Sequence, residues 1–159
     1  MNKITAVCPG SFDPVTYGHI DIFKRAADIF GNVVVLVMQN DSKDPVFSPE
    51  ERCSLIRQCV GNDPRISVIS GSGLCAKRCA EIENSVIVKG IRNLSDYEYE
   101  QTLSQANLAL GSPETLFLPC SPEYSFISTS LGLSVYHLGE DASAFFPPEV
   151  LKALDHINQ

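Results

Sequence analysis

The sequence is poor in basic residues, in histidine and in long apolar runs. Only 12 of its 159 residues are Lys or Arg, against 19 Asp or Glu, which gives a formal net charge of −7 and a pI near 4.8. Proteins that bind nucleic acid nonspecifically or bind anionic membranes rely on a summed positive field, so this composition argues against both kinds of partner. Any anionic ligand must therefore be held by a few basic side chains gathered locally.

Membrane-spanning, secretory and metal-binding patterns are also missing. No apolar run approaches the roughly 20 residues of a membrane span, and the segment before Pro9 is too short for a signal peptide, so we expect a cytoplasmic protein. The six cysteines form no CxxC pair and match no zinc spacing, although Cys75 and Cys79 lie one helical turn apart. Buried reduced thiols are commoner than a metal pair at such spacing, and we expect no metal ligands in the chain.

The sequence does contain a regular alternation of short apolar runs and amphipathic segments. Its length, with 44% hydrophobic and 19% charged residues, is typical of one globular domain over residues 1–159. Strands are predicted over residues 4–8, 33–38, 66–69, 86–88 and 115–118. Helices are predicted over residues 20–30, 48–60, 74–83 and 96–110, and from residues 128 and 147 onward. The capping box at Ser48 and Glu51, with Pro49 between them, is the clearest local signal.

Five strands alternating with helices predict an α/β fold. We expect a doubly wound, Rossmann-like, five-stranded parallel sheet with helices on both faces and further helices at the C-terminus. With the strand order 3-2-1-4-5, the chain would reverse direction between strands 1 and 4. Ligands of such sheets bind at that switch point, beyond the carboxyl ends of the strands, so the loops after these strands are the expected site.

The loop after the first strand contains groups suited to anions. Gly10 lets backbone approach a phosphate, Ser11 offers a hydroxyl and an N–H, and His19 follows at the positive end of a helix. A polar turn, with His19 serving only as a helix-start residue, is the alternative that this pattern leaves open.

Basic residues follow two other predicted strands. Lys89 and Arg92 flank Gly90 in the predicted loop after strand 4, and Lys43 lies in the loop after strand 2. Ordinary solvated surface charges would have the same composition. Their position at the carboxyl ends of the strands favours a shared anion site.

In combination, these segments resemble the bacterial phosphopantetheine adenylyltransferases of the HxGH nucleotidyltransferase superfamily, in which a TxGH variant occurs, here Thr16-Tyr17-Gly18-His19. The similarity spans nearly the whole chain through PGSFDPVTYGHID, NDSKDPVF, SPEER, KGIR, DYEYE and EYSFISTS. It implies a single nucleotidyltransferase domain that transfers AMP from ATP to 4′-phosphopantetheine, giving dephospho-coenzyme A and pyrophosphate. It also implies Mg²⁺ held mainly by ATP phosphates and water, a homohexamer, and coenzyme A as a possible feedback ligand.

The resemblance further assigns roles to residues. His19 would stabilise the transition state, and Lys43 would grip the reacting phosphates. The acceptor would be bound by Ser11, Lys43, Cys75 and Lys89, with Cys75 acting through its backbone. The ATP-binding set would be Ser11, Phe12, His19, Gly90, Ile91, Arg92, Glu100, Tyr124, Ser125, Phe126, Ile127, Ser128, Thr129 and Ser130.

The chemistry implied by this resemblance needs no general base. A phosphate monoester has its second pKa near 6 and is already a nucleophilic dianion at pH 7, which fits a sequence with only three histidines. Two rival functions remain: a sister nucleotidyltransferase that uses nicotinate mononucleotide or CTP, and a noncatalytic sensor of coenzyme A or adenine nucleotides.

The sequence departs from the family pattern at three places, which involve four residues. Lys89 stands where relatives carry an arginine, so a planar fork becomes a point charge and acceptor affinity is expected to be weaker. Asp44 replaces a common basic residue, and Leu133-Ser134 replace a common Lys-Glu pair. We expect these last two changes to affect surface or subunit contacts.

Overall fold

The fold is described from a computed structural model, which covers residues 3–39 and 44–158. Five strands form one parallel sheet in the order β3-β2-β1-β4-β5, which confirms the expected doubly wound topology. The strands are β1 (Thr5–Gly10), β2 (Val33–Met38), β3 (Ile66–Gly71), β4 (Ser85–Ile91) and β5 (Thr115–Pro119). The helices are α1 (Tyr17–Phe30), α2 (Pro49–Val60), α3 (Cys75–Ala80), α4 (Leu94–Ala109), α5 (Thr129–His137) and α6 (Pro148–Ile157), with a 3-10 turn, η1 (Pro122–Tyr124).

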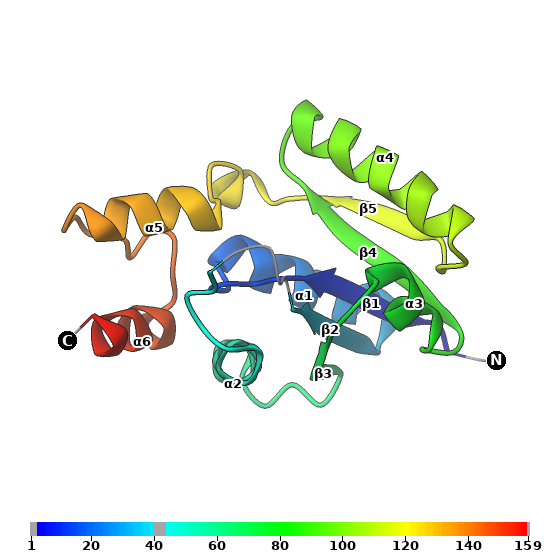
Figure 1. The fold of residues 1–159 in the computed structure, drawn as a ribbon, viewed down its shortest axis with the longest axis horizontal. Helices are drawn as coiled ribbons and strands as arrows, with labels where there is room; N and C mark the ends of the chain where they lie inside the picture. Colours follow the sequence, from blue (N-terminus) through cyan, green and yellow to red (C-terminus); the bar gives the residue numbers. More distant parts are fainter. Residues whose placement is uncertain (1–2, 40–43, 159) are drawn as a thin grey trace.

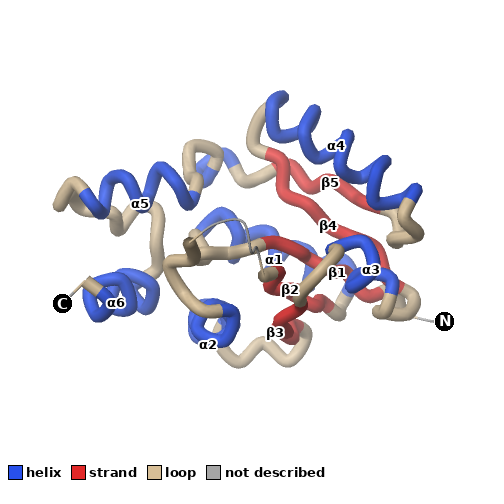
Figure 2. Tube along the Cα trace, viewed as in Figure 1, coloured by secondary structure: helices blue, strands red, loops and turns tan. Residues whose placement is uncertain are grey.

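The layers of the molecule are visible in Figures 1 and 2. Helix α4 runs along β4 and β5 at one end, whereas α5 and α6 lie at the opposite end. No helix within the described part of the chain is long and apolar enough to span a lipid bilayer.

The central strands are buried on both faces. Ala6 and Cys8 of β1 pack into the larger core with α1 and α2, while Val7 between them packs into a smaller core with Cys79 and Ile87. Successive side chains of a strand point to opposite faces, so this split is what two covering helix layers require. It explains why the strand sequences are continuous apolar runs rather than alternating ones.

Local capping signals set the ends of the first two helices. Thr16 caps α1 in a reciprocal box with His19, and the helix ends at Gly31, whose φ is 73°. Ser48 and Glu51 form the predicted box at the start of α2. These side chains satisfy backbone N–H groups that have no partner inside the helix.

Several predicted boundaries are wrong. Strands β1 and β3 each run two residues further than predicted, to Gly10 and Gly71. Strand β4 continues to Ile91, so Lys89, Gly90 and Ile91 lie in the strand and pair with residues 117–119 of β5 instead of forming a loop. Helix α3 ends at Ala80, short of the predicted residue 83, because the chain turns there and Asn84 adopts a φ of 48°. Pairing with a distant strand extended β4, and a strand pattern alone does not reveal that partner.

Two glycines permit close packing near the carboxyl edge of the sheet. A Cβ at Gly90 would stand 2.8 Å from Ile22 Cγ1 of α1, and a Cβ at Gly132 would stand 2.6 Å from Phe146 Cζ. Both distances are too short for a real carbon atom. The end of β4 therefore packs directly against α1, and α5 packs directly against the buried ring of Phe146.

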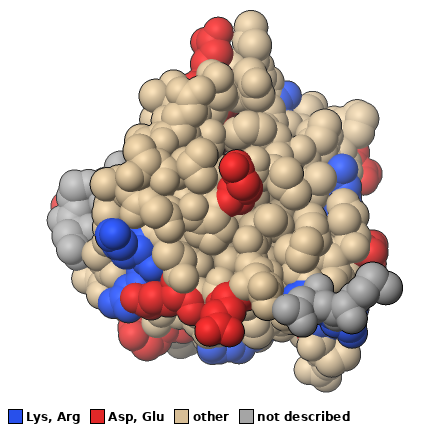
Figure 3. Space-filling view, turned by 90° about the vertical axis from the view of Figure 1, so that its right-hand side faces the viewer, with Lys and Arg blue, Asp and Glu red and all other residues tan. Residues whose placement is uncertain are grey.

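The face seen in Figure 3 carries few charged side chains over most of its area. Acidic and basic groups gather mainly along its lower margin, where the two signs are mixed. The Lys and Arg side chains coloured blue on this face do not converge on one site. The local cluster of basic residues expected from the sequence must therefore lie elsewhere, at the carboxyl ends of the strands.

Candidate active site

A cavity of about 710 Å³ opens at the carboxyl ends of β1 and β4, where the order of the strands reverses. Its walls come from the loop after β1, the start of α1, the end of β4, one side of α4 and the segment from Cys120 to Leu133. The predicted site residues that line it are Ser11, Phe12, His19, Lys89, Gly90, Arg92, Glu100, Tyr124, Ile127, Ser128, Thr129 and Ser130. The switch point thus gathers most of the residues that the sequence nominated.

Other nominated residues are placed differently. Lys43 lies outside the described residues. Ile91, Cys75, Ser125 and Phe126 do not line the cavity. The Ser125 hydroxyl donates to the Pro122 carbonyl at 2.9 Å, and the exposed Phe126 ring meets Phe145 edge-on, with ring centroids 5.7 Å apart.

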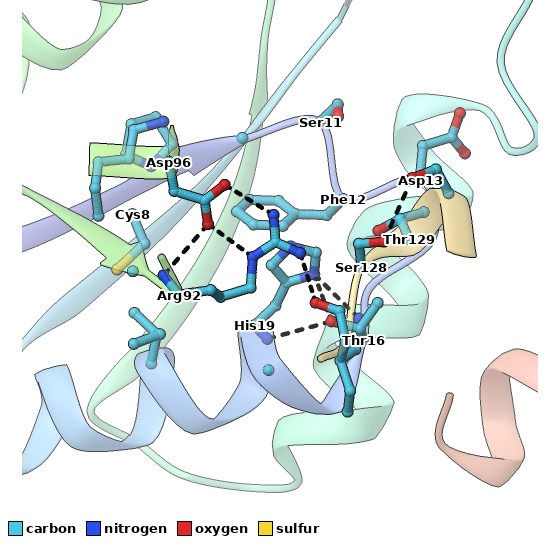
Figure 4. A pocket seen from close by; sticks show the side chains of 18 of the residues that line it. Cys8, Ser11, Phe12, Asp13, Thr16, His19, Arg92, Asp96, Ser128 and Thr129 are labelled. Atoms are coloured by element: carbon cyan, nitrogen blue, oxygen red, sulfur yellow. Dashed lines mark hydrogen bonds and ion pairs between the residues drawn. The ribbon is translucent and has the colours of Figure 1, made fainter. Parts of the chain in front are cut away.

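His19 is held by the cap of its own helix. The Thr16 backbone N–H donates to His19 Nδ1 at 3.1 Å, so Nδ1 is an acceptor and the proton of the neutral ring lies on Nε2. Burial, together with the positive charges of Arg92 and Lys89, lowers the pKa of His19 to about 4. At neutral pH the ring is therefore an uncharged Nε2–H donor with a fixed tautomer. Figure 4 shows Thr16 and His19 joined in this way.

Phe12 supports the imidazole from the side. Its φ of 48° is unusual for a residue other than glycine, and its ring meets His19 and Phe23 edge-on at centroid distances of 5.0 and 5.1 Å. The ring also folds back over Gly10, where a Cβ would lie 2.7 Å from Phe12 Cζ. The glycine is thus required by the aromatic ring that supports His19.

Arg92 joins two walls of the cavity. Its Nε and Nη2 donate to the two carboxylate oxygens of Asp96 at 2.8 and 3.0 Å, while Nη1 donates to the Ile127 carbonyl at 2.7 Å. Figure 4 shows the guanidinium between the end of β4 and the segment that carries Ser128 and Thr129. These contacts use three of the five N–H donors of the guanidinium and fix its plane, and the two that remain on Nη1 and Nη2 can meet phosphate oxygens.

Lys89 and Glu100 form a partly buried pair across the same edge. The distances from Lys89 Nζ to the two Glu100 oxygens are 3.4 and 3.5 Å, and the two side chains are 23% and 20% exposed. Sequence reasoning assigned Lys89 to the acceptor and Glu100 to the nucleotide. In the free chain each neutralises the other, so a bound phosphate would compete with Glu100 for the lysine.

The carboxylates of the cavity are largely engaged. Asp13 accepts the backbone N–H groups of Val46 and Phe47 at 2.8 and 2.9 Å, while Asp96 and Glu100 pair with cations. Residues 3–39 and 44–158 contain no group of three or more His, Cys, Asp or Glu arranged to hold a metal ion. This donor set suits a magnesium ion bound through phosphate oxygens and water better than one bound by a protein cage.

Two departures from the family pattern lie closer to the site than expected. Asp44 and Leu133 both line the cavity, so the interpretation of these changes as surface or subunit contacts is wrong for these two residues. Ser134 fits it, because it is exposed and its hydroxyl donates to the Ser130 carbonyl within α5.

The cysteine pair on α3 forms a contact without a metal. Cys75 and Cys79 have their sulfur atoms 3.9 Å apart, and all six cysteines of the chain are free thiols. The hydrogen bond to Cys79, helped by the charge of Lys89, lowers the pKa of Cys75 to about 7, and the same bond and burial raise the pKa of Cys79. The half-buried Cys75 is therefore the thiol with the larger thiolate fraction.

Sequence reasoning missed several residues that organise the site. It did not identify the Thr16 backbone N–H as the donor to His19 Nδ1, or Asp96 as the ion-pair partner of Arg92. It also did not identify Asp13 as the acceptor of the backbone N–H groups of residues 46–47. The four-residue spacing of Arg92 and Asp96 was an available signal for their ion pair. Arg52, which also lines the cavity, had no signal beyond its place in the SPEER segment.

A parallel sheet with cations and a helix start gathered at its switch point has the features of a nucleotide-binding enzyme. The family model described as cytidylyltransferase-like matches residues 7–131, which is most of the chain. A solved structure, the lipopolysaccharide core biosynthesis protein from Thermoplasma volcanium GSS1, shares the fold. It superposes with a TM-score of 0.52 at 23% identity, covering 74% of this chain and 96% of that one.

Two curated relatives are much more similar in sequence. A phosphopantetheine adenylyltransferase of Nocardioides sp. (strain ATCC BAA-499 / JS614) is 46% identical over 145 residues, covering 91% of each chain. A phosphopantetheine adenylyltransferase of Streptomyces coelicolor (strain ATCC BAA-471 / A3(2) / M145) is 46% identical over 149 residues, covering 94% of each. The chain therefore belongs to the phosphopantetheine adenylyltransferase family of cytidylyltransferase-like nucleotidyltransferases.

Proposed function

We propose that this chain transfers the adenylyl group of ATP to 4′-phosphopantetheine, producing dephospho-coenzyme A and pyrophosphate. The observation that carries the proposal is the hydrogen bond from the Thr16 backbone N–H to His19 Nδ1, which leaves Nε2 of His19 as the donor in a cavity shared with Arg92 and Lys89. The names of the relatives support phosphopantetheine as the acceptor.

The reaction is an in-line displacement at phosphorus. An oxygen of the acceptor phosphate forms a bond to the α-phosphorus of ATP while the bond to the departing pyrophosphate breaks, with no covalent enzyme intermediate. Because the acceptor is a dianion at neutral pH, no residue has to remove a proton from it. The protein's task is to bring two anions together and stabilise the charge that develops.

His19 is suited to the second task. A neutral donor adds no net charge in the free site, yet it strengthens its hydrogen bond as charge builds on an α-phosphate oxygen. In this proposal Arg92, the N-terminus of α5 and the hydroxyls of Ser128 and Thr129, which border the cavity, bind the triphosphate. Lys89 binds the acceptor phosphate, and Lys43 grips the reacting phosphates.

Magnesium enters this proposal together with the nucleotide. When bound, it would neutralise charge on the triphosphate, held by phosphate oxygens and water. None of Asp13, Asp96 and Glu100, which have backbone or cationic partners in the free chain, is needed as a ligand of the ion in this arrangement.

Three further expectations belong to the same proposal. A homohexamer, a cytoplasmic location, and coenzyme A or dephospho-coenzyme A acting as a feedback ligand are all implied by the resemblance to the family. Exposed apolar side chains on α4 and β5, including Leu94, Tyr97 and Leu116, give an assembly apolar surface to cover.

The decisive assay measures pyrophosphate release with purified protein and Mg²⁺. ATP with 4′-phosphopantetheine should give turnover, while CTP in place of ATP, or nicotinate mononucleotide in place of phosphopantetheine, should give little. Mass spectrometry of the product should show the mass of dephospho-coenzyme A. Release with another pair alone would make the chain a sister nucleotidyltransferase, and binding without release from any pair would make it a sensor.

A further inference from the structure

Arg52 of α2 is an unusual residue in this protein. Among residues 3–39 and 44–158 it is the only Asp, Glu, Lys or Arg classed as buried, and it is 3% exposed. It nevertheless lines the cavity that holds His19 and Arg92. The resemblance to the family gave it no role.

The guanidinium of Arg52 connects the ends of two neighbouring strands. Its Nη1 donates to the Ser11 carbonyl at 2.7 Å and to the Met38 carbonyl at 3.2 Å. Met38 ends β2, and Ser11 directly follows β1, its parallel neighbour. Arg52 therefore fixes the backbone of Ser11, the residue expected to contact both the acceptor phosphate and ATP.

No carboxylate among the described residues neutralises the positive charge of Arg52. No carboxylate in the described ranges lies within ion-pair distance of its guanidinium, and its Nε is buried without a hydrogen-bond partner. Burying an unpaired cation is costly, and two carbonyl acceptors offset only part of that cost. A phosphate in the adjoining cavity would supply the missing negative charge.

A second arginine of the same helix offers a contrast. Arg57 donates to the Val68 carbonyl of β3 at 2.6 Å, so it also joins α2 to the sheet. Arg57 is exposed, however, and does not line the cavity. The same kind of backbone contact is thus made without burying a charge.

We propose that Arg52 is a positioning residue for the transfer reaction, holding Ser11 at the end of β1 so that its hydroxyl and N–H face the acceptor phosphate. The buried charge makes that position favourable for a phosphate dianion. This inference rests on the proposed function, and it assigns to α2 a part in substrate binding.

A double-mutant cycle between Arg52 and Ser11 tests the inference. Arg52→Lys keeps the charge but removes Nη1, the nitrogen that donates to both the Ser11 and the Met38 carbonyl, so kcat/KM for 4′-phosphopantetheine should fall about 10- to 100-fold. In a Ser11→Ala background the same change should cost less than about threefold, because the hydroxyl that Arg52 positions is already missing and only the backbone N–H remains to be misplaced. Arg57→Lys, the matched control, should change kcat/KM by less than about twofold.

Thermal unfolding and acceptor binding complete the test. If Arg52 served the fold alone, Arg52→Lys would lower Tm with equal kinetic losses in both backgrounds, and that result would overturn the proposal. A variant too unstable to assay would also count against a positioning role. Calorimetric binding of 4′-phosphopantetheine separates this proposal from the proposed function. If the wild-type chain binds the acceptor but does not transfer AMP, the proposed function is wrong. Non-additive losses of acceptor affinity in the Arg52 and Ser11 variants would still support the positioning role of Arg52.

Discussion

Helices α1 and α4 border the same cavity but are held in very different ways. Over 14 residues α1 buries five side chains in the larger core, including Phe23, which is 1% exposed. Over 16 residues α4 buries none, and Tyr97 on it is 42% exposed. One wall of the site is therefore part of the core, while the other is an outer layer that lies along β4 and β5.

This difference separates the groups that drive chemistry from those that bind. His19 belongs to the buried wall, where its ring is fixed by Thr16 and Phe12. Asp96 and Glu100 belong to the outer wall, where each holds a cation that can be offered to an anion. A donor that stabilises a transition state must be fixed in place, whereas residues that admit and release substrates benefit from looser packing.

The largest expected effect is a difference between the two walls in what each side chain contributes to the free energy of unfolding. Phe23→Ala should lower the free energy of unfolding by about 3–5 kcal/mol, the usual cost of removing a buried aromatic ring. Tyr97→Ala should cost less than about 1 kcal/mol, since its ring is half exposed. Urea denaturation measures both values. Equal losses would mean that the outer face of α4 is covered in solution, for instance by another copy of the chain.

The next effect concerns the buried wall alone. His19→Ala should reduce kcat about 100-fold or more with little change in ATP affinity, as expected on losing one transition-state donor. His137→Ala, at the exposed end of α5, is the matched control and should keep wild-type turnover. Steady-state pyrophosphate release and nucleotide binding give both readouts, and wild-type turnover in the His19 variant would remove its assigned role.

Acid should destabilise the folded chain through His19 in the buried wall. The pKa of His19 is lowered from 6.5 to about 4 in the folded chain, so between these values the unfolded chain binds a proton that the folded chain does not. The free energy of unfolding should therefore fall as pH drops below about 6.5 and level off near pH 4, by more than about 1 kcal/mol. Urea titrations from pH 4 to 8 should show that His19→Gln loses this component, and an unchanged pH dependence would contradict it.

The smallest expected effect concerns Lys89 of β4, which pairs with Glu100 of the outer wall. Lys89→Arg should lower KM for 4′-phosphopantetheine a few-fold, because a guanidinium can hold a phosphate with two parallel hydrogen bonds. kcat should stay within about twofold, since His19 is untouched. Initial rates at saturating ATP measure both constants, and an unchanged or higher KM would show that Lys89 already suits this site.

The features predictable from sequence were those with local causes. The cap at Ser48, the apolar strands and the cations at the strand ends led to the topology and to most of the cavity lining. Contacts between distant segments could not be predicted in this way. The extension of β4 depends on β5, and the role of Arg52 depends on carbonyls 14 and 41 residues away along the chain.

The close contact between Gly132 and Phe146 has a consequence for anyone redesigning the length of this protein. Residues after Tyr136 carry none of the nominated ligand-binding groups, so a truncation there would look harmless from the site alone. Yet the ring of Phe146 fills the space beside Gly132 and seats the helix whose first turn carries Ser130. A shortened chain would keep every binding residue and lose the surface that aligns them, so affinity tags should be added beyond α6 rather than replace it.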